Sequence, residues 1–221
     1  STAPACTGDS VDFQNTGTSS ASYAWNFGSG ATPATSVTEN PLNVVYASAG
    51  IKNVKLVTTL GSCKDSITNT LNLTQTPAPS FTQNFPAPNA QCEGAAVNFT
   101  YTSTSDTIWT YLWNFGVGAT PSSSNIKNPQ GVIYSGSGSK NVLLTVVTNG
   151  LCSEVAATTF TINPTPVASF TSNSSYCTGD SVDFQNTGTT TALYSWDFGS
   201  GASPAIDTVE NPLNIVYATP G

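Results

Sequence analysis

Five cysteines are the side chains of this chain with the clearest chemical potential: Cys6, Cys63, Cys92, Cys152 and Cys177. Thiols form disulfides or bind zinc, but a zinc site needs three or four Cys or His ligands close together. The 221-residue chain contains no His, and no pair of its cysteines has the Cys-x-x-Cys spacing of a zinc site. The cysteines therefore favour disulfides, and the sequence predicts no metal site.

Acid–base chemistry has few candidates in this composition. The chain has 12 acidic residues, five Lys and no Arg, with a net charge of -7. Without His, the commonest general acid, general base and metal ligand is missing. Clustered cations that could neutralise phosphates are also missing, which argues against a nucleic-acid partner. No run of about 18 apolar residues predicts a membrane span. We therefore expect a protein that is not an enzyme and uses no cofactor.

An internal repeat organises the chain. Residues 6–50 and 177–221 align without gaps and share 32 of 45 residues, and a more divergent copy starts at Cys92. We name the copies repeat 1 (1–75), repeat 2 (76–163) and repeat 3 (164–221). Repeat 1 is expected to lack its first strand and repeat 3 its last strands, as in a window cut from a longer array. The alternative is that a neighbouring chain supplies the missing strand.

Three aromatic positions recur in every repeat. Each repeat has a Trp, a Phe two residues later and a Tyr 21 residues after the Trp. Alternation at a period of two places Trp and Phe on one face of a strand, which predicts a core rather than a sugar-stacking surface. The predicted core residues are Trp25, Trp113, Trp196, Phe27, Phe115, Phe198, Tyr46, Tyr134 and Tyr217.

The fold class follows from short alternating segments. They are separated by clusters of Gly, Pro, Asn and Ser, which are typical of turns, and no stretch shows helical periodicity. About seven short strands in a repeat of this length fit an all-β, immunoglobulin-like sandwich of two sheets. Because each complete repeat has two cysteines, we expect one disulfide per repeat, Cys6 with Cys63 and Cys92 with Cys152. Cys177 would then pair beyond Gly221, in an oxidising, extracytoplasmic compartment.

Asp9 and Asp12 could form a weak calcium site. Their counterparts in repeat 2 are Ala95 and Asn98. A calcium site is therefore not a general property of the repeat.

The motif Tyr-x-Trp-Asn/Asp-Phe-Gly-x-Gly, followed by Asn-Pro, a Tyr, a Gly turn and Lys-Asn-Val-x-Leu, resembles the PKD (polycystic kidney disease) domain. The match departs from the family where Ser29, Val117 or Ser200 replaces its second acidic residue. The opening Cys-x-Gly-x-x-Val-x-Phe is similar to PKD-type repeats of large Bacteroidota surface proteins, including gliding-motility adhesins.

This resemblance implies a structural or adhesive role at the cell surface or outside the cell, as a stalk or filament. The partners it implies are neighbouring repeats, further copies assembling sideways into a fibre, and surface polysaccharide. The alternative is a polysaccharide-binding accessory module of a secreted hydrolase.

Five Asp residues precede a Ser or Thr and then an aliphatic residue, a pattern similar to the O-glycosylation signal of that phylum. The same pattern is also ordinary turn chemistry at the start of a strand. The candidate glycosylation sites are Ser10, Ser66, Thr107, Ser181 and Thr208.

Overall fold

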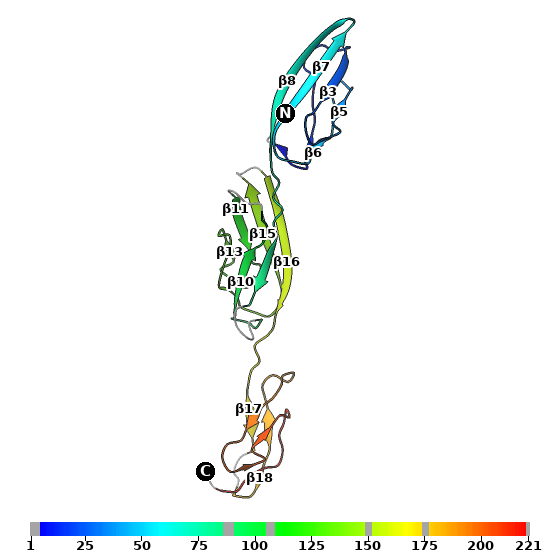
Figure 1. Cartoon of the computed structure of the whole chain (residues 1–221). Coiled ribbons are helices and arrows are strands. Elements are labelled where there is room, and N and C mark those ends of the chain that lie inside the picture. The colour runs from blue at the N-terminus through cyan, green and yellow to red at the C-terminus, as the bar shows by residue number, and fades with distance from the viewer. Residues whose placement is uncertain (1–4, 86–90, 105–108, 149–151, 174–176, 220–221) are drawn as a thin grey trace. The chain divides into compact units, whose positions relative to one another are not determined.

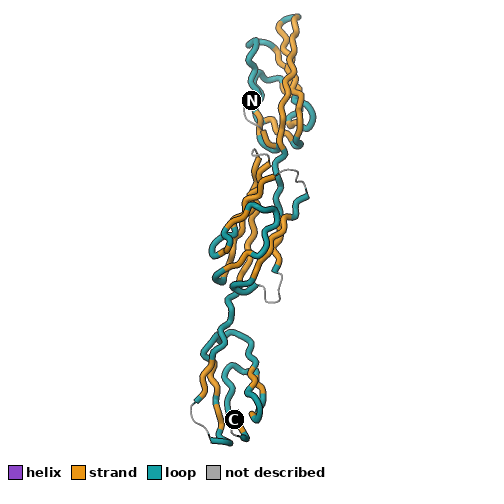
Figure 2. Tube along the Cα trace, turned by 90° about the vertical axis from the view of Figure 1, so that its left-hand side faces the viewer, coloured by secondary structure: helices purple, strands orange, loops and turns teal. Residues whose placement is uncertain are grey.

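The computed structural model describes residues 5–85, 91–104, 109–148, 152–173 and 177–219. Every regular element within these ranges is a strand, and Figure 2 shows strands joined by loops. The same ranges hold no helix that could cross a membrane. The chain forms two compact units, Ser1–Asn163 and Pro164–Gly221. The predicted fold class, tandem immunoglobulin-like β-sandwiches, is confirmed, while the division into three repeats stays a prediction.

Repeat 2 is a sandwich of two four-stranded sheets whose paired strands are all antiparallel (Figure 1). In order across the first sheet, the strands are β12 (Ala119–Thr120), β14 (Val132–Tyr134), β10 (Ala96–Tyr101) and β9 (Phe81–Asn84). The second sheet contains β13 (Ser123–Ser124), β11 (Trp109–Asn114), β15 (Gly138–Thr148) and β16 (Cys152–Ile162).

Repeat 1 has the same plan with a different strand count. Its larger sheet contains β1 (Ala5–Cys6), β8 (Cys63–Thr74), β7 (Gly50–Leu60), β3 (Ser22–Asn26) and β5 (Thr35–Ser36). Its smaller sheet contains β2 (Ser10–Val11), β6 (Val44–Tyr46) and β4 (Ala31–Thr32).

The described strands of repeat 3 form small sheets. They are β17 (Phe170–Ser172) with β19 (Phe184–Asn186), then β18 (Ser181–Val182), β23 (Ile215–Tyr217) and β21 (Ala202–Ser203), and finally β20 (Trp196–Asp197) with β22 (Ile206–Asp207).

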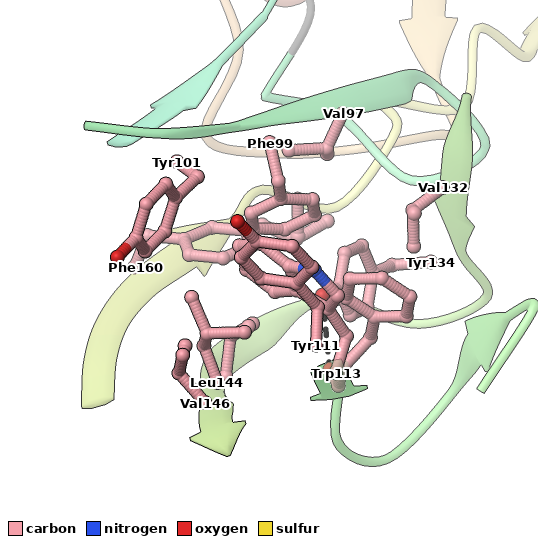
Figure 3. Close-up of a cluster of buried hydrophobic side chains, with 13 residues drawn as sticks. Val97, Phe99, Tyr101, Tyr111, Trp113, Val132, Tyr134, Leu144, Val146 and Phe160 are labelled. Carbon is pink, nitrogen blue, oxygen red and sulfur yellow. Dashed lines mark hydrogen bonds between the residues drawn. The ribbon is translucent and has the colours of Figure 1, made fainter. Parts of the chain in front are cut away.

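The core of repeat 2 is packed with aromatic rings between the two sheets (Figure 3). The Trp113 ring lies 4.9 Å from that of Phe81 and 5.6 Å from that of Phe99, measured between centroids. Burial alternates along β10 and β11, as a half-buried strand requires. Rings at these separations pack favourably beyond the area that they bury.

The Phe-Gly step after the core strand of repeats 1 and 2 has a steric cause. Gly116 has a φ of 78°, and a Cβ there would lie 2.5 Å from the backbone oxygen of Asn141. Gly28 has a φ of 82°, and its Cβ would lie 3.0 Å from the oxygen of Asn53. Only glycine combines this backbone conformation with such a close approach of the next strand. The recurring motif is therefore a turn that brings two strands together.

The two repeats of the first unit differ at one flank of the sandwich. In repeat 2, β9 pairs with β10 and places Phe81 against Trp113. Among the described residues, no strand pairs with the corresponding residues 12–15 of repeat 1. An open groove of about 640 Å³ lies there instead, lined by residues that include Phe13, Trp25 and Leu56.

Candidate functional site at the joint between repeats 1 and 2

The two cysteines of repeat 1 lie at opposite ends of its last strand. Cys63 begins β8, and Thr74, the last residue of β8, is the parallel partner of Cys6 in β1. Eleven steps of extended chain separate the two positions by about 36 Å. Bridged cysteines need Cα atoms closer than about 7 Å. The predicted Cys6–Cys63 disulfide is therefore wrong.

Repeat 2 has the same arrangement. Cys152 begins β16, whereas Cys92 forms a parallel bridge with Asn163, just beyond the other end of that strand. The predicted Cys92–Cys152 disulfide is wrong for the same reason. The length of the last strand, rather than the number of cysteines per repeat, decides which thiols can meet.

The disulfide of the first unit joins repeat 1 to repeat 2. Cys6 and Cys152 are bonded, with an S–S distance of 2.02 Å and a Cα–Cα distance of 5.8 Å, although 146 residues separate them in sequence. Cys63, Cys92 and Cys177 are free thiols in this structure. The end of repeat 1 that holds Cys6 thus meets the hairpin tip of repeat 2 that holds Cys152.

The hairpin side of this joint is closed to solvent. Cys152 is 1% exposed and Thr148, its partner across the hairpin, is 2% exposed. The Thr148 hydroxyl lies 3.2 Å from the carbonyl oxygen of Gln75, its acceptor in the linker, and 3.3 Å from that of Cys152. The Cys152 sulfur lies 3.9 Å from the carbonyl oxygen of Thr74, a packing contact because an oxidised sulfur has no proton to donate. The hairpin therefore packs on the chain that leaves repeat 1.

The linker side is held by two threonines. The Thr76 backbone N–H donates to the Thr7 hydroxyl at 2.9 Å, and the Thr76 hydroxyl donates to the Thr7 carbonyl at 2.5 Å. Pro77 follows and is buried. These bonds fix the linker against the segment that carries Cys6. Sequence reasoning missed this contact set, because Thr is abundant throughout the chain and nothing distinguishes these threonines from the others.

The disulfide also shortens the covalent path through the unit. From Cys6 the path crosses to Cys152 and follows β16 and Asn163 to the next linker at Pro164. It bypasses the 145 residues between the two cysteines, which are most of both sandwiches. β16 is already extended, so it has almost no slack to release under tension.

The recurring aromatic residues have internal partners in all three repeats. The indole nitrogens of Trp25, Trp113 and Trp196 donate to backbone carbonyls at 3.0, 2.9 and 2.9 Å. Trp25 and Trp113 are buried and Trp196 is half-buried. Buried indoles offer no face for sugar stacking in repeats 1 and 2.

The tyrosine hydroxyls bind the carbonyl that follows each core strand. Tyr46 donates to Phe27 at 3.0 Å, and Tyr134 donates to Phe115 at 2.9 Å. In repeat 3, the Tyr217 hydroxyl donates to the carbonyl oxygen of Phe198, which is itself buried, at 3.0 Å. Burial raises the pKa of Tyr46, and it raises the pKa of Tyr134 to about 12.

The acidic side chains considered for calcium bind backbone instead. Asp12 accepts from the Asn43 N–H at 2.8 Å, and Asn98 accepts from the Gly131 N–H at 2.9 Å. An amide and a carboxylate thus serve the same turn, which explains why repeat 2 needs no acid there. The described residues contain no group of three possible metal ligands.

Four of the candidate glycosylation sites are exposed: Ser10, Ser66, Ser181 and Thr208. Thr107 lies outside the described residues. At two of the sites the preceding aspartate binds the backbone of the site residue, since Asp65 accepts from the Ser66 N–H at 2.8 Å and Asp207 from the Thr208 N–H at 2.6 Å.

No protein-family model and no curated protein matches the chain. Solved structures similar to it include an amphioxus IgVJ-C2 molecule, at 13% identity and a TM-score of 0.34, covering 71% of this chain and 97% of that one. Another is a mutated variant of titin domains I67–I69, at 12% identity and a TM-score of 0.39, covering 99% of this chain and 86% of that one. Likeness at this level carries no argument about function.

Proposed function

We propose that the chain is a non-catalytic structural segment of a secreted or cell-surface protein, in which a disulfide clamps one repeat to the next. It acts as a stalk or as part of an extracellular filament. The single observation that carries this proposal is the Cys6–Cys152 bond, because it connects two sandwiches rather than stabilising one.

A clamp of this kind resists pulling. Tension applied at the chain ends would pass from Cys6 to Cys152 and along β16, while the residues between the two cysteines carry no load. A segment whose role is to hold two distant points together gains from this arrangement, because its sandwiches stay folded under force. An enzyme or a soluble binding module has no such need.

The cellular setting belongs to the same proposal. A persistent disulfide requires an oxidising compartment, which supports an extracellular location. The PKD-like motif and its resemblance to Bacteroidota surface adhesins support a stalk or filament whose partners are neighbouring repeats, laterally assembled copies and surface polysaccharide. O-linked sugars at the exposed Asp-Ser/Thr sites fit that setting.

Single-molecule stretching of the oxidised and the reduced chain tests the clamp. After reduction, complete unfolding should lengthen the chain by about 500 Å more than in the oxidised state, because the bypassed residues become extensible. Cys6→Ser should reproduce the reduced behaviour under oxidising conditions, while Cys63→Ser should behave as the oxidised parent. Equal extension of the oxidised and reduced chains would rule out the clamp.

A further inference from the structure

We propose that Cys92 and Cys63 are the two halves of a second joint of the same kind, which forms when one copy of this repeat pair follows another. Cys92 of the first copy bonds Cys63 of the second. The proposal rests on the clamp function above and extends it from a single bond to a continuous chain of clamps. It assigns a partner to two thiols that the structure leaves free.

Cys92 has the same backbone setting as Cys6. In each repeat the N–H of the residue after the cysteine donates to the end of the last strand, to Thr74 O at 2.9 Å in repeat 1 and to Asn163 O at 3.0 Å in repeat 2. The following N–H donates to the carbonyl of the core Tyr at 3.0 Å in both repeats. Cys92 is half-buried at this end of repeat 2. In the proposed joint, the hairpin of the next repeat packs against this end.

Cys63 has the same setting as Cys152. Each is the first residue of the last strand and pairs across the hairpin with the last residue of the strand before it, Leu60 or Thr148. The two differ in their surroundings, because Cys152 is 1% exposed in its joint whereas Cys63 and Leu60 are exposed. Cys63 thus has the position of a joint cysteine without the partner.

The linkers after the two repeats have equal length and related sequence. Six residues lie between Thr74 and Phe81 after repeat 1, and six lie between Asn163 and Phe170 after repeat 2. Both linkers contain Thr-Pro followed, after two residues, by Ser-Phe-Thr. The chain after repeat 2 can therefore bring a hairpin tip back to Cys92, as the chain after repeat 1 brings Cys152 to Cys6.

The bond forms by thiol–disulfide exchange with a small disulfide such as oxidised glutathione. The Cys92 thiolate attacks one glutathione sulfur and releases one glutathione thiol. The Cys63 thiolate then attacks the Cys92 sulfur of the mixed disulfide and releases the second glutathione. Two protein thiols are oxidised to one disulfide, and one glutathione disulfide is reduced to two thiols.

A tandem protein tests the joint. Residues 1–171 are placed directly before the complete chain of residues 1–221, which preserves the 171-residue offset between Cys6 and Cys177. After refolding with oxidised and reduced glutathione, free thiols are alkylated and the peptides are mapped without reduction. The expected map links Cys92 of the first copy to Cys63 of the second, and Cys6 to Cys152 within each copy.

Cys63→Ser in the second copy is the matched control. It should restore complete alkylation of Cys92 in the first copy and leave both Cys6–Cys152 bonds in place. Cys6–Cys152 bonds together with alkylation of both Cys92 of the first copy and Cys63 of the second would contradict the proposed second joint. That result would leave the proposed clamp intact. Cys6–Cys63 peptides would overturn both. A scrambled mixture would also overturn the second joint, since a bond set by geometry forms with one partner.

Discussion

The hairpin tips of repeats 1 and 2 are equivalent in sequence position and opposite in environment. The tip of repeat 2 carries Cys152, buried and bonded, while the tip of repeat 1 carries Cys63, exposed and free. One flank of the sandwich is likewise covered in repeat 2, by β9, and exposed in repeat 1, where a groove remains open. In repeat 2, the hairpin end is therefore closed by repeat 1 and the flank by the repeat's own strand β9.

The largest expected effect comes from the joint itself. The double substitution Cys6→Ser and Cys152→Ser removes the bond that closes a loop of 146 residues. In the loop-entropy description, this loss lowers the free energy of unfolding by about 5 kcal/mol. Denaturant unfolding of the double variant and the oxidised parent measures the loss. Cys63→Ser should leave stability unchanged, and a comparable loss in that control would contradict the difference between the two tips.

Core substitutions should cost more in the covered repeat than in the open one. Trp113→Ala removes an indole that packs against Phe81, Phe99 and Phe115, at a cost of about 3–5 kcal/mol. Trp25→Ala removes an indole that packs against Phe13 and Phe27 beside the groove, and we expect a smaller cost. Denaturant unfolding of both variants checks the order, and equal losses would show that the flank contributes nothing.

The alternation pattern and the landmark spacing were sufficient to predict the all-β sandwich, because burial on one face of a strand leaves a mark at every second residue. The disulfide pairing could not be predicted in that way. It depends on the length of β8, and Thr, Asn and Ser dominate the exposed first part of that strand, where alternation is weak. The joint contacts of Thr148 and Thr76 also leave no sequence pattern, since they bind backbone carbonyls and a hydroxyl of residues distant in sequence.

A smaller effect is expected from the polar contact behind the disulfide. Thr148→Val leaves the Gln75 carbonyl without its hydroxyl donor and should cost about 1 kcal/mol. Thr161→Val, at an exposed position of β16, is the matched control and should cost less. Urea unfolding of the oxidised proteins compares the two variants. A larger loss of unfolding free energy for the control would show that the Thr148 hydroxyl does not stabilise the joint.

An effect of similar size depends on pH. Because burial raises the pKa of Tyr134 from 10.0 to about 12, the neutral side chain stabilises the fold below pH 10, and that contribution is lost as the pH rises through about 12. Tyr134→Phe loses the hydrogen bond to Phe115, so it should be less stable than the parent at pH 8 by about 1 kcal/mol. Unfolding measured from pH 8 to 12 should show this gap narrowing above pH 10. A difference in unfolding free energy that stays constant up to pH 12 would contradict the raised pKa of Tyr134.

The disulfide between repeats 1 and 2 is tested most directly by a non-reducing peptide map of the oxidised 221-residue chain, after alkylation of its free thiols. We predict one disulfide-linked peptide pair, containing Cys6 and Cys152, with Cys63, Cys92 and Cys177 alkylated. Peptides linking Cys6 to Cys63 and Cys92 to Cys152 would contradict it, because each repeat would then be stabilised within itself and no clamp would join them.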